Sequence, residues 1–200
     1  AIGGAIAIVA TGSFFRALER QDGAPTRSGA AWTPALMAVC PLFWMTGLRP
    51  MSDMPGLAGA LVAMALTVRG IGDRRHLVTG AFVAGLAIGI RSQVAWLTLP
   101  IIATVLTVER RAGFWWLVTR PVAALAVGGL IWAIPLVIAS GGIDVYWRAL
   151  GAQATLDFAG VDMLWTNPTP RRLALSLYET FVLPWASVPL ARVVGVAAGA

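Results

Sequence analysis

The chain has 200 residues, of which 58% are hydrophobic and only 12% are charged, and its formal net charge is +6. Soluble domains are about 45–50% apolar and about 25% charged, so this composition excludes an ordinary soluble domain and indicates membrane spans. All fifteen basic residues are arginine, which a GC-rich genome explains, and the positive charge does not indicate nucleic acid as a partner.

The single cysteine, Cys40, excludes a disulfide within the chain, and with His76 as the single histidine the sequence contains no Cys/His metal cluster. It also contains no nucleophile elbow, phosphate-binding glycine loop or zinc signature. We therefore identify no cofactor, and dependence on a divalent metal stays open. The chain starts without Met inside one apolar run and stops inside another, so we expect it to be an internal fragment of a longer protein.

The apolar residues gather in long runs along the whole chain. The sequence predicts an all-α fold: a polytopic transmembrane helix bundle of about seven spans that forms one domain over residues 1–200. Several runs are shorter than the ~20 residues that cross a bilayer, and flanking residues can extend them. The runs lie at 1–15, 30–48, 54–68, 77–90, 94–108, 121–139 and 186–200.

The connections between these runs alternate in positive charge. Because cytoplasmic loops carry an excess of arginine, the richer set is expected in the cytoplasm of a bacterial cell and the chain in its inner membrane. The richer set holds Arg16, Arg20, Arg27, Arg69, Arg74, Arg75, Arg110, Arg111 and Arg120, and the other holds Arg49, Arg91, Arg148, Arg171 and Arg172.

This orientation places one long segment, 140–185, outside the membrane. Ile143, Trp147 and Leu150 recur there at helical spacing, which predicts an amphipathic helix lying on the membrane surface. A break at 166–170 follows, and Pro170 is suited to the first turn of a second surface helix.

The two short outer connections are the most informative places for chemistry. The first contains Arg49 and Asp53, and the second contains Arg91 and Gln93. An arginine at the outer end of a span can bind a phosphate through two parallel hydrogen bonds, and a carboxylate beside it can orient it or assist proton transfer. The alternatives are that both arginines extend to lipid headgroups and that Asp53 is the N-cap of the next helix.

The spans and loops resemble those of the GT-C fold integral-membrane glycosyltransferases, near the protein mannosyltransferases and the aminoarabinose transferases. The resemblance covers most of the 200 residues. It is carried by Pro41-Leu-Phe-Trp-Met-Thr-Gly-Leu-Arg-Pro-Met-Ser-Asp-Met-Pro55, by Gly85-Leu-Ala-Ile-Gly-Ile-Arg-Ser-Gln93 with Trp96-Leu-Thr-Leu-Pro100, and by the long outer loop after 121–139.

The resemblance implies transfer of a hexosyl or pentosyl group from a polyprenyl-phosphate donor to a lipid, glycan or protein acceptor at the extracytoplasmic face. It makes 1–15 the second span and places the main catalytic acidic loop upstream of the chain. Asp53 matches the family's second outer acidic position and has a supporting catalytic role, while Arg49 and Arg91 bind the donor phosphate. Gln93, Tyr146 and Arg148 are candidate substrate-binding residues, the last two on a surface helix that can close over the site.

Two other functions remain open from the residues alone. The chain can be a carrier, flippase or polymerase for lipid-linked glycans, although such proteins hold charges at mid-membrane depth and here the charges cluster at the ends of the runs. It can also be a membrane scaffold in which each outer arginine is an anchor. The bilayer is a partner in every case, and the oligomeric state is open.

Overall fold

The computed structural model describes residues 2–23, 29–47, 52–109, 114–158 and 168–181, and within these ranges the chain is helical without strands, as predicted. The α-helices are α1 (Ile2–Gln21), α2 (Thr33–Val39), α3 (Pro41–Gly47), α4 (Asp53–Arg69), α5 (Arg74–Ile90), α6 (Ala95–Val108), α7 (Phe114–Ala139), α8 (Ile143–Phe158) and α9 (Pro170–Phe181), with short 3-10 helices η1 (Gly29–Ala31) and η2 (Ser92–Val94).

Contacts within the chain define two compact units. The first comprises Ala1–Val39 with Phe43–Leu136, and the second comprises Cys40–Leu42 with Val137–Ala200. The first unit contains the helices that carry the candidate site, and the second contains α8 and α9. A single domain over 1–200 stays a prediction.

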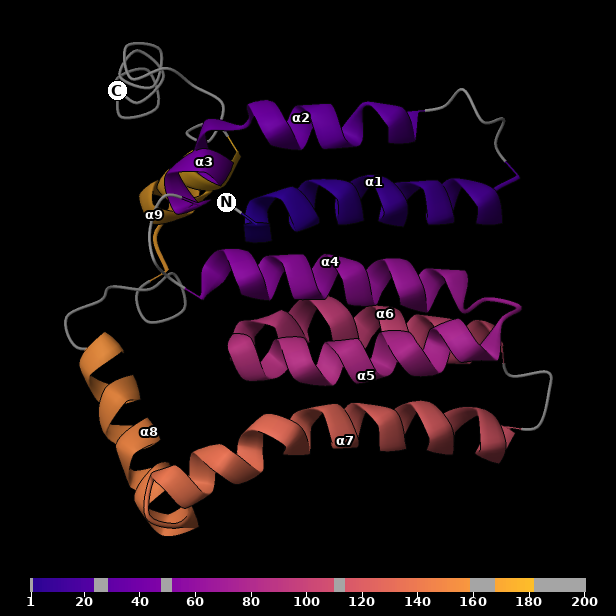
Figure 1. Ribbon diagram of the computed structural model, residues 1–200. Helices are drawn as coiled ribbons and strands as arrows, with labels where there is room; N and C mark the ends of the chain where they lie inside the picture. Colours follow the sequence, from indigo (N-terminus) through magenta and orange to yellow (C-terminus); the bar gives the residue numbers. More distant parts are fainter. Residues whose placement is uncertain (1, 24–28, 48–51, 110–113, 159–167, 182–200) are drawn as a thin grey trace. The chain divides into compact units, whose positions relative to one another are not determined.

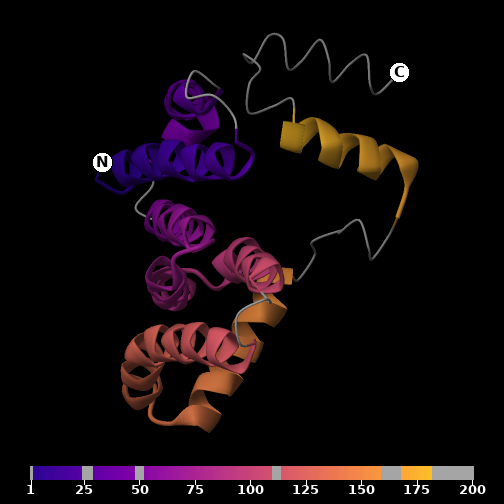
Figure 2. The same ribbon diagram turned by 90° about the vertical axis from the view of Figure 1, so that its right-hand side faces the viewer.

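Helix α4 is the centre of the first unit. It packs between α1 and α5, and α6 contacts both α4 and α5 (Figures 1 and 2). Helices α1 and α4 run in the same direction and α5 runs in the opposite one (Figure 1). The carboxyl ends of α1, α4 and α6 therefore lie together, with Arg20 and Arg69 in the last turns of α1 and α4, and the start of α4 lies with the end of α5 at the opposite end of the first unit.

The core of this unit is made of small side chains. Buried Ala60 and Ala63 of α4 pack with Ala87 and Ala84 of α5, respectively. Only Leu77, Thr67 and Thr98 are both large and fully buried in the part of the chain described. Small residues let helix backbones approach closely, which is the packing typical of helices in a membrane.

Large apolar side chains instead point outward. Ile2 of α1 is 79% exposed, and Ile138 of α7 is 73% exposed. On α7 the exposed apolar residues follow almost the whole helix: Val122, Val127, Leu130, Ile131, Ile134, Leu136 and Ile138. An extended apolar surface of this kind is rare on a protein surrounded by water.

Helices α5 and α7 cross on glycines. A Cβ atom on Gly85 would collide with the carbonyl oxygen of Leu125, and one on Gly128 would collide with that of Phe82. The Trp132 indole covers Gly89, and its Nε1 donates a 3.1 Å hydrogen bond to the Gly85 carbonyl oxygen. Gly85 and Gly89 therefore serve helix packing.

The helices match six of the predicted runs, with two differences. The run 30–48 is broken at Cys40 between α2 and α3, and α7 begins at Phe114 instead of 121. The seventh run, 186–200, lies outside the described residues.

The predicted number of spans is not confirmed. Among the described residues, only α1 and the stretch Val118–Ala139 are long and apolar enough to cross a membrane by length and composition. Helices α4 and α5 have 17 residues each, which is about 26 Å at 1.5 Å per residue and slightly less than the ~30 Å hydrocarbon core.

In the second unit Gly141 and Gly142, with φ angles of 85° and 122°, lie between the end of α7 and the start of α8. Helix α8 then starts at Ile143, and α9 starts at Pro170, as the sequence predicts. Within this unit the apolar side chains of Ile143, Trp147 and Phe181 are exposed. A location on the membrane surface stays a prediction.

Candidate functional site

Asp53 and Arg91 lie at the same end of the first unit. Asp53 is the first residue of α4, and Arg91 directly follows the last residue of α5. Because α4 and α5 are antiparallel neighbours, the start of one meets the end of the other. This end lies opposite the arginine-rich connections (Figure 1).

The two side chains form an ion pair between Arg91 Nη1 and Asp53 Oδ1. The arginine side chain is 38% exposed and the aspartate side chain 27%, so the pair is partly open to its surroundings. Each charge also suits its helix end, because an anion is stabilised at a helix N-terminus and a cation at a C-terminus. The structure therefore joins two candidate residues from separate loops.

Gly56 makes room for this pair. A Cβ atom on Gly56 would lie 2.9 Å from Arg91 Cβ and 3.5 Å from a methyl group of Val94. Only a residue without a side chain lets the start of α4 come this close to the end of α5. Sequence reasoning missed Gly56, although a glycine one turn after Asp53 is a usable signal for close helix approach.

The alternative interpretation of Asp53 as an N-cap needs correction. The helix begins one residue earlier than predicted, so Ser52 occupies the N-cap position and Asp53 lies in the first turn. The Ser52 side chain makes no capping hydrogen bond. The Asp53 carboxylate is instead directed to Arg91, which links α4 to α5.

The backbone at Arg91 turns the chain from α5 into α6. Arg91 is extended, with φ −151° and ψ 113°, and its N–H donates to the Ala87 carbonyl oxygen at 3.1 Å. The short helix η2 follows, and its Gln93 is exposed one turn from the ion pair. An amide and a guanidinium thus stand close together along the chain at an open edge.

The other predicted site residues, Arg49, Tyr146 and Arg148, do not belong to the described part of the first unit. Arg49 lies outside the described residues. Tyr146 and Arg148 belong to α8 of the second unit, where the Tyr146 ring packs edge-on against Trp147 and Arg148 Nε donates to the Asp144 carbonyl oxygen at 3.3 Å. Their role in binding a substrate stays a prediction.

No protein family, no curated protein and no solved structure matches this chain. The resemblance to the GT-C glycosyltransferases thus rests on the quoted segments and the order of the spans.

The described residues contain no group of three or more His, Cys, Asp or Glu side chains that could hold a metal ion. What the arrangement offers chemically is a guanidinium, its carboxylate partner and a nearby amide at one end of a helix bundle. A guanidinium has five N–H donors, and one carboxylate leaves several of them available to another anion.

Proposed function

We propose that this chain is part of a membrane glycosyltransferase that moves a sugar from a polyprenyl-phosphate donor to a lipid, glycan or protein acceptor at the extracytoplasmic face. The observation that carries the proposal is the ion pair of Asp53 with Arg91 at the end of the bundle that is poor in arginine. This is where the resemblance places the head of the donor.

A polytopic bundle is part of the proposal. It is supported by the small-residue core and by the apolar side chains exposed along α7. The arginine-rich connections at one end give it an orientation, because positive loops stay in the cytoplasm. Asp53, Arg91 and Gln93 then lie at the outer boundary, where a lipid-linked head group leaves the hydrocarbon.

The chemistry requires two functions of the protein. The acceptor hydroxyl oxygen forms a bond to the anomeric carbon while the bond from that carbon to the phosphate oxygen breaks, and the phosphate leaves with the electron pair. A carboxylate must take the hydroxyl proton, and a cation must stabilise the charge that develops on the phosphate. Arg91 supplies the cation, Asp53 orients it, and the resemblance assigns the proton acceptor to an upstream loop.

The test is an in vitro transfer assay on the full-length protein in nanodiscs with radiolabelled polyprenyl-phosphate sugars. Arg91→Ala is expected to lower the rate by about 100-fold or more, since removing one donor to a developing anion typically has that effect. Asp53→Ala is expected to lower it as well, with the helical circular-dichroism signal retained in both variants. Arg75→Ala, at an exposed position of the opposite end, serves as the matched control.

Unchanged transfer by folded Arg91→Ala protein contradicts the role of Arg91. The absence of transfer from any donor by the folded wild type contradicts the enzyme function. That second outcome favours a carrier, flippase or polymerase for lipid-linked glycans.

A further inference from the structure

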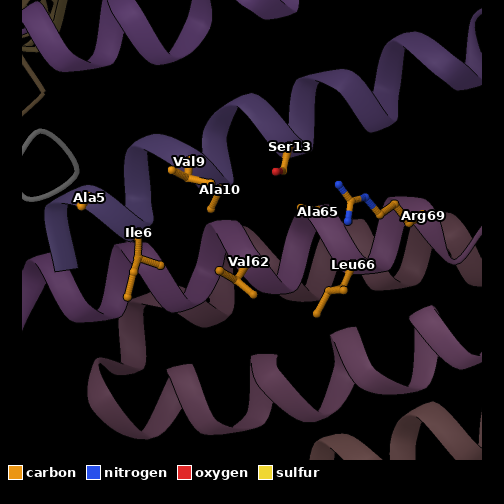
Figure 3. Close-up of a pocket in the computed structure, with 9 residues that line it drawn as sticks. All are labelled: Ala5, Ile6, Val9, Ala10, Ser13, Val62, Ala65, Leu66 and Arg69. Carbon is orange, nitrogen blue, oxygen red and sulfur yellow. The ribbon is translucent and has the colours of Figure 1, made fainter. Parts of the chain in front are cut away.

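A second feature of the first unit lies beside the C-terminal half of α4, away from the Asp53–Arg91 pair. An apolar groove of about 380 Å³ runs between α1 and α4, which is within the ~300–1,000 Å³ range of ligand pockets. Its walls include Ile6 and Val9 of α1 with Val62 and Leu66 of α4 (Figure 3). Ser13 and Arg69 supply the polar groups at one end.

Arg69 lies at one end of the groove and carries a hydrogen-bond donor that has no partner among the described residues. Figure 3 shows its side chain extending from α4 toward Ser13 on α1. The Nε atom of Arg69 is buried and has no hydrogen-bond partner in the part of the chain that the structure describes. A buried donor without a partner is unfavourable, so a ligand that accepts its hydrogen bond would be favoured there.

A second, polar hollow of about 370 Å³ meets the first one at Arg69. It is also lined by Arg20, Gln21, Asp73 and His76. The Asp73 carboxylate already accepts from the N–H of Arg75 and lies 2.7 Å from His76 Nδ1, and these contacts hold the pKa of Asp73 below its usual value. The hollow is lined by two positive charges, from Arg20 and Arg69, and one negative charge, from Asp73, so its net charge is positive.

The two hollows together have the shape and polarity of an amphiphile. One is apolar and the other is polar and cationic, and Arg69 belongs to both. We infer that an anionic phospholipid of the cytoplasmic leaflet binds here, with an acyl chain between α1 and α4 and its phosphate on Arg69 and Arg20. Anionic lipids are concentrated in that leaflet, and basic pockets beside spanning helices bind their head groups.

This inference rests on the membrane topology of the proposed function but not on glycosyl transfer. The inferred lipid site is therefore tested by measuring lipid binding and not enzymatic activity. The full-length protein is purified in detergent, and native mass spectrometry measures its binding of phosphatidylglycerol, of phosphatidylcholine and of a polyprenyl phosphate.

The wild type is expected to bind phosphatidylglycerol at least about 10-fold more tightly than phosphatidylcholine, since the two differ in net charge. Arg69→Gln is expected to remove most of that preference, whereas Arg75→Gln, an exposed arginine outside both hollows, is expected to keep it. Val9→Trp fills the apolar groove from an exposed position of α1 and is expected to weaken the binding of both phospholipids.

Equal binding of the two phospholipids by the wild type overturns the inference, and so does an equal effect of Arg69→Gln and Arg75→Gln. Preferred binding of polyprenyl phosphate, lost in Arg69→Gln, shows that the groove takes the carrier lipid instead. If Arg69→Gln fails to fold, unchanged binding by folded Val9→Trp still contradicts the proposed site. Loss of lipid preference together with normal sugar transfer leaves the proposed function standing.

Discussion

At the scale of single residues, the central feature is the contact of Asp53 with Arg91. Both side chains keep part of their surface exposed, although the paired Asp53 Oδ1 atom itself is buried. An exposed ion pair in water contributes about 0–1 kcal/mol to the free energy of unfolding. Their position at two helix ends adds electrostatic complementarity but does not need a ligand. Stability and function at this pair can therefore be separated by experiment.

Reversal of the pair tests this separation. In Asp53→Arg with Arg91→Asp the two side chains can still attract each other, but each charge now opposes the dipole of its helix end. We expect the free energy of unfolding of the double variant to lie within about 1–2 kcal/mol of the wild-type value. The rate of sugar transfer is expected to stay at the level of Arg91→Ala. Chemical denaturation and the transfer assay measure the two effects, and restored transfer would show that the pair is only a structural link.

At the scale of helices, the packing depends on positions where no side chain fits. The α5–α7 crossing brings backbone against backbone at Gly85 and Gly128, and α4 approaches α5 through Gly56 and Gly59. At Gly85 and Gly128 even one methyl group must displace a carbonyl oxygen, which cannot move independently of its helix, and at Gly56 and Gly59 it would meet a Cβ atom. The cost of a substitution thus depends on the neighbour and not on the helix propensity of the new residue.

Gly85→Ala with Gly129→Ala as its matched control separates these effects. At Gly129 an added Cβ atom meets nothing within 4 Å, so the substitution is expected to stabilise α7 by up to about 1 kcal/mol. At Gly85 the added Cβ atom meets the Leu125 carbonyl oxygen, and we expect a loss of about 1–3 kcal/mol. Thermal unfolding in the same detergent compares them, and equal stability of the two variants would contradict the close crossing.

At the scale of the whole molecule, the distribution of charge predicts which end faces the cytoplasm. The arginine-rich connections follow α1, α4 and α6, and the ion pair lies at the other end of these helices (Figure 1). Both proposals use this polarity, since the sugar donor would be bound at one face and the anionic phospholipid at the other.

Cysteine labelling tests the polarity directly. In a Cys40→Ala background, Ser92→Cys near the ion pair and Arg75→Cys at the start of α5 place single thiols at exposed positions of opposite ends. We expect a membrane-impermeant maleimide to label the cysteine at position 92 in intact spheroplasts and the one at position 75 only after lysis. Labelling of both from outside, or the reverse order, would contradict the orientation.

The class of secondary structure and most helix positions follow from the order of residues along the chain. Long apolar runs admit few structures other than helices, and strong local signals such as Pro170 and the glycine pair before Ile143 set where helices begin. The sequence also separated the charges into two sets of connections, because that property depends only on order along the chain. It did not reveal the break at Cys40, because Pro41 directly after it also fits inside a spanning helix, where proline is tolerated.

Only the tertiary structure decided which of these residues meet. Asp53 and Arg91 are 38 positions apart, and their contact depends on the antiparallel packing of α4 on α5 and on the missing side chain at Gly56. From the sequence, Arg69 was predicted only as one of the arginines of the richer set of connections. The parallel packing of α1 and α4 places it at the end of an apolar groove. Such contacts arise from the direction and closeness of whole helices, which local propensity and periodicity do not encode.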